Sequence, residues 1–273
     1  MSLVARTLRF AILALLLLVA NARAEVGREV VDIELRPGVT NRLLLVKPAA
    51  PVATIVLFAG GDGRLDIGAN GDIRVLGGNF LIRTRERFAS HGLLTIVADA
   101  PSDRQGPDGL GAYRLYAEHA RDVGAIIAFA RLRLAAPVWL AGTSLGTLSA
   151  GNAAVKLGSD GADGIVLTST TFRGYKNRGS PLGDDIFDLD LAAIRVPVLI
   201  AHHRDDGCFV SPFADVETLR GKLKNSSEVG VLAYEGGLPP IAGACEGRAQ
   251  HGYYGIEARV VTEIAGWIMA RRR

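Results

Sequence analysis

The sequence predicts an α/β domain with a mostly parallel central sheet, an antiparallel edge at its N-terminal end and helices on both faces. Short aliphatic and β-branched runs alternate with helical stretches along the chain. A composition of 49% hydrophobic residues and 33 glycines suits one compact core. The first two strand-like runs are separated only by Pro37-Gly38, which is typical of an antiparallel pair.

The elements follow from these patterns in chain order. Each predicted strand is a short apolar or alternating run: Glu29–Leu35, Arg42–Lys47, Ala53–Ala59, Leu93–Asp99, Pro137–Ala141, Gly164–Thr168, Val196–His202 and Val229–Tyr234. A glycine-rich loop, Gly60–Gly78, follows the third strand. The predicted helices are Phe80–His91, Ala112–Leu134, Thr147–Lys156, Phe213–Lys224 and Ile256–Ala270. In such a sheet, ligands bind beyond the carboxyl ends of the strands.

Residues 1–24 have the three parts of an export signal. Arg6 and Arg9 are basic, Phe10–Ala20 is apolar, and Ala22-Arg23-Ala24 supplies small residues before Glu25. The apolar run is about half the roughly 20 residues that a spanning helix needs, so we expect cleavage rather than a stable membrane anchor. We therefore predict a signal peptide at 1–24, one domain at 25–273, and a periplasmic or secreted protein.

The charge balance does not favour nucleic acid. The chain has 31 basic and 28 acidic residues, and the signal holds three arginines and no acid, so the remainder is formally neutral. Its basic residues are scattered apart from Arg271-Arg272-Arg273, which we interpret as a solvated helix end. Cys208 and Cys245 predict one disulfide in an oxidising compartment, with two buried thiols as the alternative.

Gly142-Thr143-Ser144-Leu145-Gly146 is the most informative motif. It lies between a predicted strand and a predicted helix. A Gly-x-Ser-x-Gly turn in this context holds its serine in a strained backbone conformation above the sheet, and the glycines leave room for neighbouring backbone. We predict that Ser144 is a nucleophile.

A serine hydroxyl needs a base and a group that orients the base. Of the five histidines, His251 alone lies in a late loop after the last strand, and we choose it as the base. Asp206 follows a strand end, and the spacing from His202 to Asp206 resembles the His-Gly-x-x-Asp pattern of hydrolases, with His203 in place of the glycine. We choose Asp206 as the acid; Asp205 is the alternative.

An acyl-transfer site also needs N–H donors for the oxyanion. Leu145, which follows the nucleophile, supplies one from its backbone. The other is expected in the loop after the third strand, where we choose Gly61, with Gly60 as the alternative.

Four polar residues near these strand ends have an open role. Asp99 and Asp103 flank a proline-containing loop, and we favour a structural role over contact with substrate. Asn79 and Arg83 are explained equally well by contact with a polar substrate group and by helix capping or surface charge.

The combination of serine turn, glycine loop, acid and histidine resembles the α/β-hydrolase superfamily over nearly all of the chain after the signal. The phrases Gly78–Arg83, Asp99–Arg104 and His251–Glu257 resemble those of uncharacterised exported bacterial members. The resemblance implies hydrolysis through an acyl-serine intermediate without a cofactor. It implies neither a particular substrate nor an oligomeric state. We do not expect a metal site, because the adjacent His202 and His203 point to opposite faces of a strand.

The segment between the sixth and seventh predicted strands is too short for a large cap domain. It is also too polar for the apolar lid of a long-chain lipase. Its charged residues are Arg173, Lys176, Arg178, Asp184, Asp185, Asp188 and Asp190. We therefore predict a carboxylesterase acting on a small or short polar ester. An exopeptidase or amidase with the same triad is the enzymatic alternative, and a non-catalytic binding protein with this fold is the alternative from another class.

Overall fold

The structure, a computed structural model, describes residues 26–174 and 185–271. The predicted signal peptide at 1–24 lies outside this part, as do Lys176, Arg178 and Asp184 of the polar segment. In the described part, that segment carries the short 3-10 helices Ile186–Asp188 and Leu191–Ala193 between β6 and β7. No helix among the described residues combines the length and hydropathy needed to cross a bilayer.

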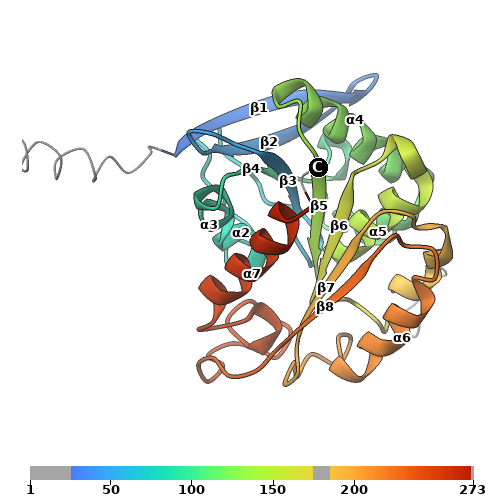
Figure 1. Cartoon of the computed structure of the whole chain (residues 1–273). Coiled ribbons are helices and arrows are strands. Elements are labelled where there is room, and N and C mark those ends of the chain that lie inside the picture. Colours follow the sequence, from blue (N-terminus) through green and yellow to red (C-terminus); the bar gives the residue numbers. More distant parts are fainter. Residues whose placement is uncertain (1–25, 175–184, 272–273) are drawn as a thin grey trace, which may run out of the picture.

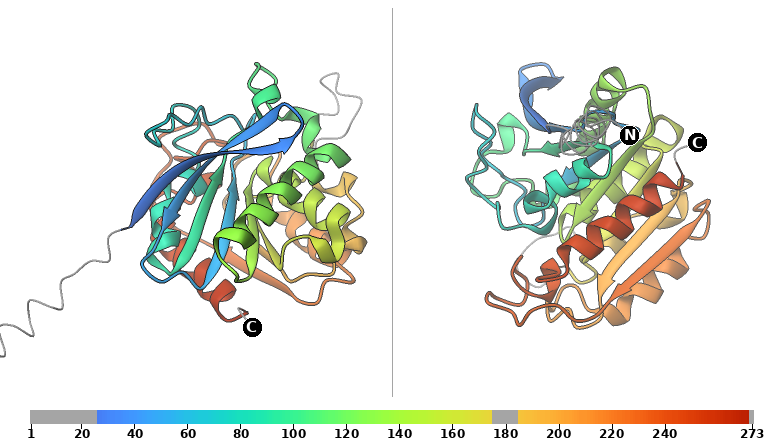
Figure 2. Two further views of the ribbon diagram at one scale, coloured as in Figure 1. Left: turned by 90° about the horizontal axis from the view of Figure 1, so that it is seen from above. Right: turned by 60° about the vertical axis from the view of Figure 1, so that its left-hand side comes forward.

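The described residues form one eight-stranded sheet in the order β1-β2-β4-β3-β5-β6-β7-β8. β2 is antiparallel to both of its neighbours, whereas the pairs from β4 to β8 are parallel. Figure 2 shows the β1–β2 ribbon and the β7–β8 pair at opposite ends of the sheet. The predicted sheet and its antiparallel N-terminal edge are confirmed. The strands are β1 (Gly27–Arg36), β2 (Val39–Lys47), β3 (Ala53–Phe58), β4 (Leu93–Ala98), β5 (Val138–Thr143), β6 (Gly164–Thr168), β7 (Val198–His203) and β8 (Val229–Tyr234).

Helices cover both faces of the sheet (Figure 1). Successive strand residues point to opposite faces, so Leu43 and Leu45 join one core cluster and Leu44 the other. The first cluster contains side chains of α4 (Ala117–Arg133), α5 (Gly146–Leu157) and α6 (Val216–Lys222). The second contains side chains of α2 (Phe80–Arg83), α3 (Arg85–Ser90) and α7 (Glu257–Met269).

Two predicted helices are divided. The stretch Phe80–His91 forms α2 and α3, which are separated at Thr84. The stretch Ala112–Leu134 forms a 3-10 helix, Gly111–Leu115, and α4, because Tyr116 between them is extended, with φ −78° and ψ 153°. The Asn152 side chain donates a hydrogen bond of 2.8 Å to the Tyr116 carbonyl, which is a tertiary contact that no local pattern reveals.

A disulfide joins Cys208 to Cys245, as predicted. It connects the loop after β7 to the loop after β8, and these loops carry Asp206 and His251.

Candidate active site

Ser144 lies in the turn between β5 and α5. Its backbone has φ +53°, the left-handed region that a residue with a Cβ rarely adopts. The turn is fixed by three hydrogen bonds: the Ser144 N–H donates to the Thr168 carbonyl, and the N–H and hydroxyl of Thr147 donate to the Ser144 carbonyl. The chain therefore holds this serine in a strained conformation at the carboxyl end of a central strand.

The two glycines of the motif are required by close backbone contacts. A Cβ on Gly142 would lie 2.2 Å from the Gly146 carbonyl oxygen. A Cβ on Gly146 would lie 2.3 Å from the Phe58 carbonyl oxygen and 2.7 Å from that of Ala59. These distances are the physical reason for the spacing of the motif: the turn packs against β3 without room for a methyl group.

Ser144 and His251 line the same cavity, which has a volume of about 340 Å³. Its walls come from the loop after β3, the turn after β5 and the loop after β8. The lining residues are Gly60, Gly61, Leu76, Gly78, Asn79, Phe80, Thr143, Ser144, Cys245, Glu246, Gly247, His251 and Gly252.

His251 is oriented by Asp206. Its Nδ1 lies 2.8 Å from Asp206 Oδ2, and both side chains are buried. Because an ionised carboxylate only accepts, Nδ1 carries the proton, and Nε2 of a neutral ring is left as an acceptor. Nε2 is buried and contacts no hydrogen-bond partner among the described residues. The histidine therefore lines the cavity that also holds Ser144, and one of its ring nitrogens has no partner among the described residues.

The two adjacent aspartates differ sharply in environment. The Asp206 side chain is fully buried, and its Oδ1 accepts a 2.9 Å hydrogen bond from the Cys208 N–H. Asp205 is exposed, and its N–H donates to His203 Nδ1 at 3.0 Å. Of the two, only Asp206 is in contact with His251 in the part of the chain that the structure describes.

His202 lies behind the Asp206 carboxylate. Its Nε2 donates to the Ser211 carbonyl at 2.8 Å and lies 3.5 Å from Asp206 Oδ2. Its ring stacks on Phe172. Burial lowers the pKa of the His202 imidazole, although Asp206 opposes the shift, so this ring is neutral near pH 7.

The loop that carries His251 is tied to the sheet by backbone contacts. The Ser169 hydroxyl donates to the His251 carbonyl at 2.7 Å, and the Tyr253 hydroxyl donates to the Ala201 carbonyl at 2.6 Å. Arg83 Nη2 donates to the Gly252 carbonyl at 2.6 Å. Sequence reasoning missed Ser169 and Tyr253, although Ser169 follows the end of β6 and so carried the same strand-end signal as Ser144.

The candidate oxyanion donors are the backbone N–H groups of Gly60, Gly61 and Leu145. Gly60 packs directly on Ser144, since a Cβ there would lie 2.9 Å from Ser144 Cβ. The Gly60 carbonyl accepts a 3.2 Å hydrogen bond from the Gly63 N–H. In a trans peptide the N–H points away from the C=O, so the Gly61 N–H points away from Gly63. The N–H groups of Gly60, Gly61 and Leu145 donate to no other described residue, which leaves all three free for a ligand, so Gly60 stays the alternative to Gly61.

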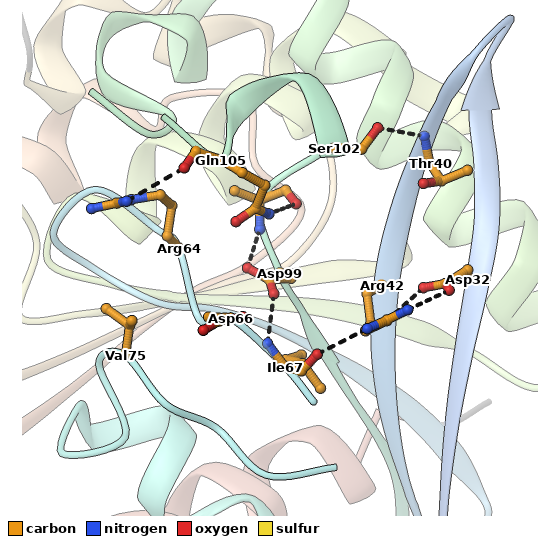
Figure 3. A pocket seen from close by; sticks show the side chains of 11 residues that line it. Asp32, Thr40, Arg42, Arg64, Asp66, Ile67, Val75, Asp99, Ser102 and Gln105 are labelled. Carbon is orange, nitrogen blue, oxygen red and sulfur yellow. Dashed lines mark hydrogen bonds and ion pairs between the residues drawn. The ribbon is translucent and has the colours of Figure 1, made fainter. Parts of the chain in front are cut away.

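The glycine-rich loop is held by Asp99. Its Oδ1 accepts from the N–H groups of Leu65 and Ala100, both at 2.7 Å, and its Oδ2 accepts from the Ile67 N–H at 3.0 Å. Figure 3 shows the Asp99 carboxylate beside Ile67 at the wall of a second, polar cavity of about 480 Å³. The structural interpretation of Asp99 is supported, and Asp103 likewise forms an ion pair with Arg36 at 2.9 Å.

The roles left open for Asn79 and Arg83 now differ. The Arg83 guanidinium is occupied by the Gly78 and Gly252 carbonyls and by Glu257. Asn79 makes no side-chain cap of α2, and its Oδ1 is buried without a described partner beside the cavity with Ser144. Asn79 is thus the residue of the two that is free to contact a bound molecule.

Several solved structures with a fold similar to this one are hydrolases. A dienelactone hydrolase from Anabaena variabilis has 14% sequence identity and a TM-score of 0.58, covering 91% of this chain and 99% of its own. A cold-adapted esterase from an Arctic intertidal metagenomic library has 14% identity and a TM-score of 0.61, covering 93% and 99%. The Pyrococcus furiosus esterase Pf2001 has 11% identity and a TM-score of 0.63, covering 90% and 92%.

Neither a protein-family model nor a curated protein matches the sequence. The likeness therefore lies in the fold, which extends over nearly the whole of this chain and of each similar structure. The chain has the fold of the α/β-hydrolase superfamily.

Proposed function

We propose that the protein is a serine hydrolase that cleaves a small ester through an acyl-serine intermediate, with Ser144, His251 and Asp206 as its triad. One observation carries this proposal: a cavity joins a strained serine to a histidine whose other ring nitrogen is bound to a buried aspartate. The similarity to an esterase and to a dienelactone hydrolase agrees with it.

In the proposed reaction, His251 Nε2 takes the proton of the Ser144 hydroxyl while Oγ bonds to the ester carbonyl carbon. The carbonyl electron pair moves to oxygen, and the N–H groups of Gly61 and Leu145 stabilise this oxyanion. The oxyanion collapses, the bond to the alcohol oxygen breaks, and the leaving alkoxide takes the proton from His251. Asp206 stabilises the imidazolium and keeps its own charge.

Water completes the cycle. His251 removes a proton from a water molecule while the water oxygen bonds to the acyl carbon. A second oxyanion forms and is stabilised by the N–H groups of Gly61 and Leu145. Its collapse breaks the bond to Ser144 Oγ, which recovers its proton from His251, and the carboxylic acid is released.

The cavity favours a short substrate. Its 340 Å³ volume is at the small end for ligand sites. Leu76 and Phe80 supply apolar wall, while Asn79 and the carboxylate of Glu246 supply polar groups. Glu246 forms no ion pair with another described residue, so esters with an anionic acyl group are disfavoured electrostatically.

We also propose that the protein is exported, with residues 1–24 removed. The disulfide between Cys208 and Cys245 supports this, because such bonds persist in oxidising compartments.

A fluorophosphonate probe and a substrate panel test the function. We expect the probe to label wild-type protein at Ser144 and to leave Ser144→Ala unlabelled. Short-chain p-nitrophenyl esters should be hydrolysed, with kcat/KM lowered at least about 10³-fold in Ser144→Ala. Turnover of aminoacyl anilides but not of esters would favour the exopeptidase or amidase alternative. Folded wild-type protein that neither reacts with the probe nor hydrolyses any member of the panel would support a binding protein instead.

A further inference from the structure

Arg114 is a buried arginine beneath the glycine loop. It lies in the 3-10 helix Gly111–Leu115 and is 1% exposed. No described carboxylate forms an ion pair with it; the nearby Asp62 is bound by Arg64 at 2.7 Å instead. Burial lowers the pKa of the Arg114 guanidinium to about 10, with Asp62 acting in the opposite direction, so the group stays charged at neutral pH.

The guanidinium binds the backbone of the loop next to the nucleophile. Nη2 lies 3.0 Å from the Ala59 carbonyl oxygen and 3.4 Å from that of Gly61. Nη1 donates to the Ser149 hydroxyl of α5 at 2.6 Å, and the same hydroxyl lies 2.9 Å from Nε2 of the buried His119. One side chain therefore links the loop after β3 to the helix that follows Ser144.

The chain is shaped closely around this group. Gly63 has φ +78°, and a Cβ there would lie 2.5 Å from Arg114 Nη2 and 2.6 Å from Leu110 Cδ1. The close approach explains why the loop has a glycine here beyond the one that packs on Ser144.

These contacts fix the direction of three successive peptide groups. Arg114 holds the carbonyls of Ala59 and Gly61, and the Gly63 N–H holds the carbonyl of Gly60 between them. With all three carbonyls bound, the intervening peptides cannot flip without breaking a hydrogen bond. The Gly61 N–H is therefore held in one orientation at the wall of the cavity.

We propose that Arg114 is a positioning residue that holds the loop Ala59–Gly63 so that its backbone N–H stabilises the oxyanion, an inference that rests on the hydrolase function proposed above. Donors that are already oriented need no reorganisation when charge develops, and this is the source of their large effect. The buried positive charge adds to the effect, because it acts on the oxyanion through a poorly polarisable interior.

The test compares Arg114→Met, Arg114→Lys and a control, Arg131→Met. Arg131 also donates to loop carbonyls, those of Asp160 and Gly161, but it lies in α4 and does not line the cavity with Ser144. Fluorophosphonate titration first counts the competent sites in each preparation, so that kcat is expressed per folded site. A trifluoromethyl ketone, which forms a tetrahedral oxyanion on the serine, reports the oxyanion site directly.

We expect Arg114→Met to lower kcat per site at least about 30-fold with KM changed less than about threefold, and to weaken binding of the ketone by the same factor as kcat/KM. Arg114→Lys should remain impaired, because a single ammonium cannot reproduce the fork that reaches both loop carbonyls. Arg131→Met should stay within about twofold of wild type. An Arg114→Met enzyme within about threefold of wild type per site, or full activity in Arg114→Lys, would overturn the positioning role.

If Arg114→Met yields no folded protein, Ser149→Ala takes its place, because it removes the acceptor of Arg114 Nη1. We expect about a fivefold lower kcat per site with KM unchanged, and unchanged kcat would overturn the proposal. Failure of this inference leaves wild-type hydrolysis and Ser144 labelling intact, whereas failure of the proposed function abolishes both.

Discussion

At the scale of single residues, the serine turn depends on the absence of particular methyl groups. Gly60 and Gly78 line the same cavity but have opposite surroundings: a Cβ on Gly60 would lie 2.9 Å from Ser144 Cβ and 3.0 Å from the Thr143 carbonyl oxygen, whereas a Cβ on Gly78 would contact nothing within 4 Å.

We therefore expect Gly60→Ala to displace Ser144 and lower kcat/KM at least about fivefold, since overpacking of this kind costs about 1–3 kcal/mol. Gly78→Ala should stay within about twofold. Ester hydrolysis by the two variants, side by side with wild type, measures both effects. Equal activity of the two would show that the Gly60 contact has no bearing on Ser144.

The two aspartates after β7 offer a second comparison. Asp206→Asn keeps the shape but removes the acceptor that fixes the His251 tautomer, so we expect kcat to fall about 10³- to 10⁴-fold. Asp205→Asn changes an exposed side chain and should leave kcat within about twofold. Active-site titration with steady-state kinetics separates them, and a larger loss in Asp205→Asn would reverse the assignment.

Most of the candidate site was predictable from the sequence because its residues follow strand ends. Ser144, Asp206, His251 and Gly61 each come after an apolar run, and the structure places Ser144, His251 and Gly61 on one cavity with Asp206 behind the histidine. Arg114 was not predictable, because an arginine in a helix-like stretch normally faces solvent, and its burial depends on the break at Tyr116.

At the scale of elements, the disulfide connects the loops that follow two neighbouring parallel strands, β7 and β8. Cys208 is buried beside Asp206, to which its N–H donates, while Cys245 is exposed at the wall of the cavity. The disulfide thus fixes the loop that carries Asp206 against the loop that carries His251.

Replacing both cysteines with serine should lower the free energy of unfolding by about 4 kcal/mol, as expected for opening a loop of 37 residues. We also expect a lower kcat, because the Asp206 loop and the His251 loop lose their covalent link. Urea unfolding and ester hydrolysis measure the two effects. Dithiothreitol should lower the free energy of unfolding and kcat of the wild type in the same way, and should leave the double variant unchanged. A double variant whose free energy of unfolding is within about 1 kcal/mol of the wild-type value would contradict the expectation.

The boundaries of the strands were predicted closely, and β6 and β8 agree residue for residue. The divided helices were not, since neither Thr84 nor Tyr116 is a glycine or a proline. At Tyr116 the break is accompanied by a tertiary hydrogen bond from Asn152. The exchange of β3 and β4 in the sheet order also lies beyond local pattern, because the strand sequences do not specify their neighbours.

At the scale of the whole molecule, stability should decrease on acidification. Burial, with a smaller effect of Arg114, lowers the pKa of His119 to about 3. An unfolded chain has a histidine pKa of about 6.5, so between these values the unfolded state binds more protons than the folded state. The stabilising effect of a neutral His119 is therefore complete above about pH 6.5 and is lost as the pH falls toward 3.

We expect this one group to remove about 2 kcal/mol of unfolding free energy between pH 7 and pH 5. The measurement is urea unfolding of wild type and His119→Gln at both values, since glutamine can bond to Ser149 without ionising. The fall should be smaller in the variant by about that amount, and the difference between the two proteins cancels the contribution of His202. Equal falls in the two proteins would assign the acid sensitivity to other groups.

The groups that meet at the cavity enter the chain far apart, from the loop after β3 to the loop after β8. A polypeptide emerging N-terminus first from a ribosome or a translocation channel exposes Ser144 long before His251 exists beside it. During that interval the hydroxyl has no base, so the proposed chemistry begins only when the segment that carries His251 has folded against Ser144.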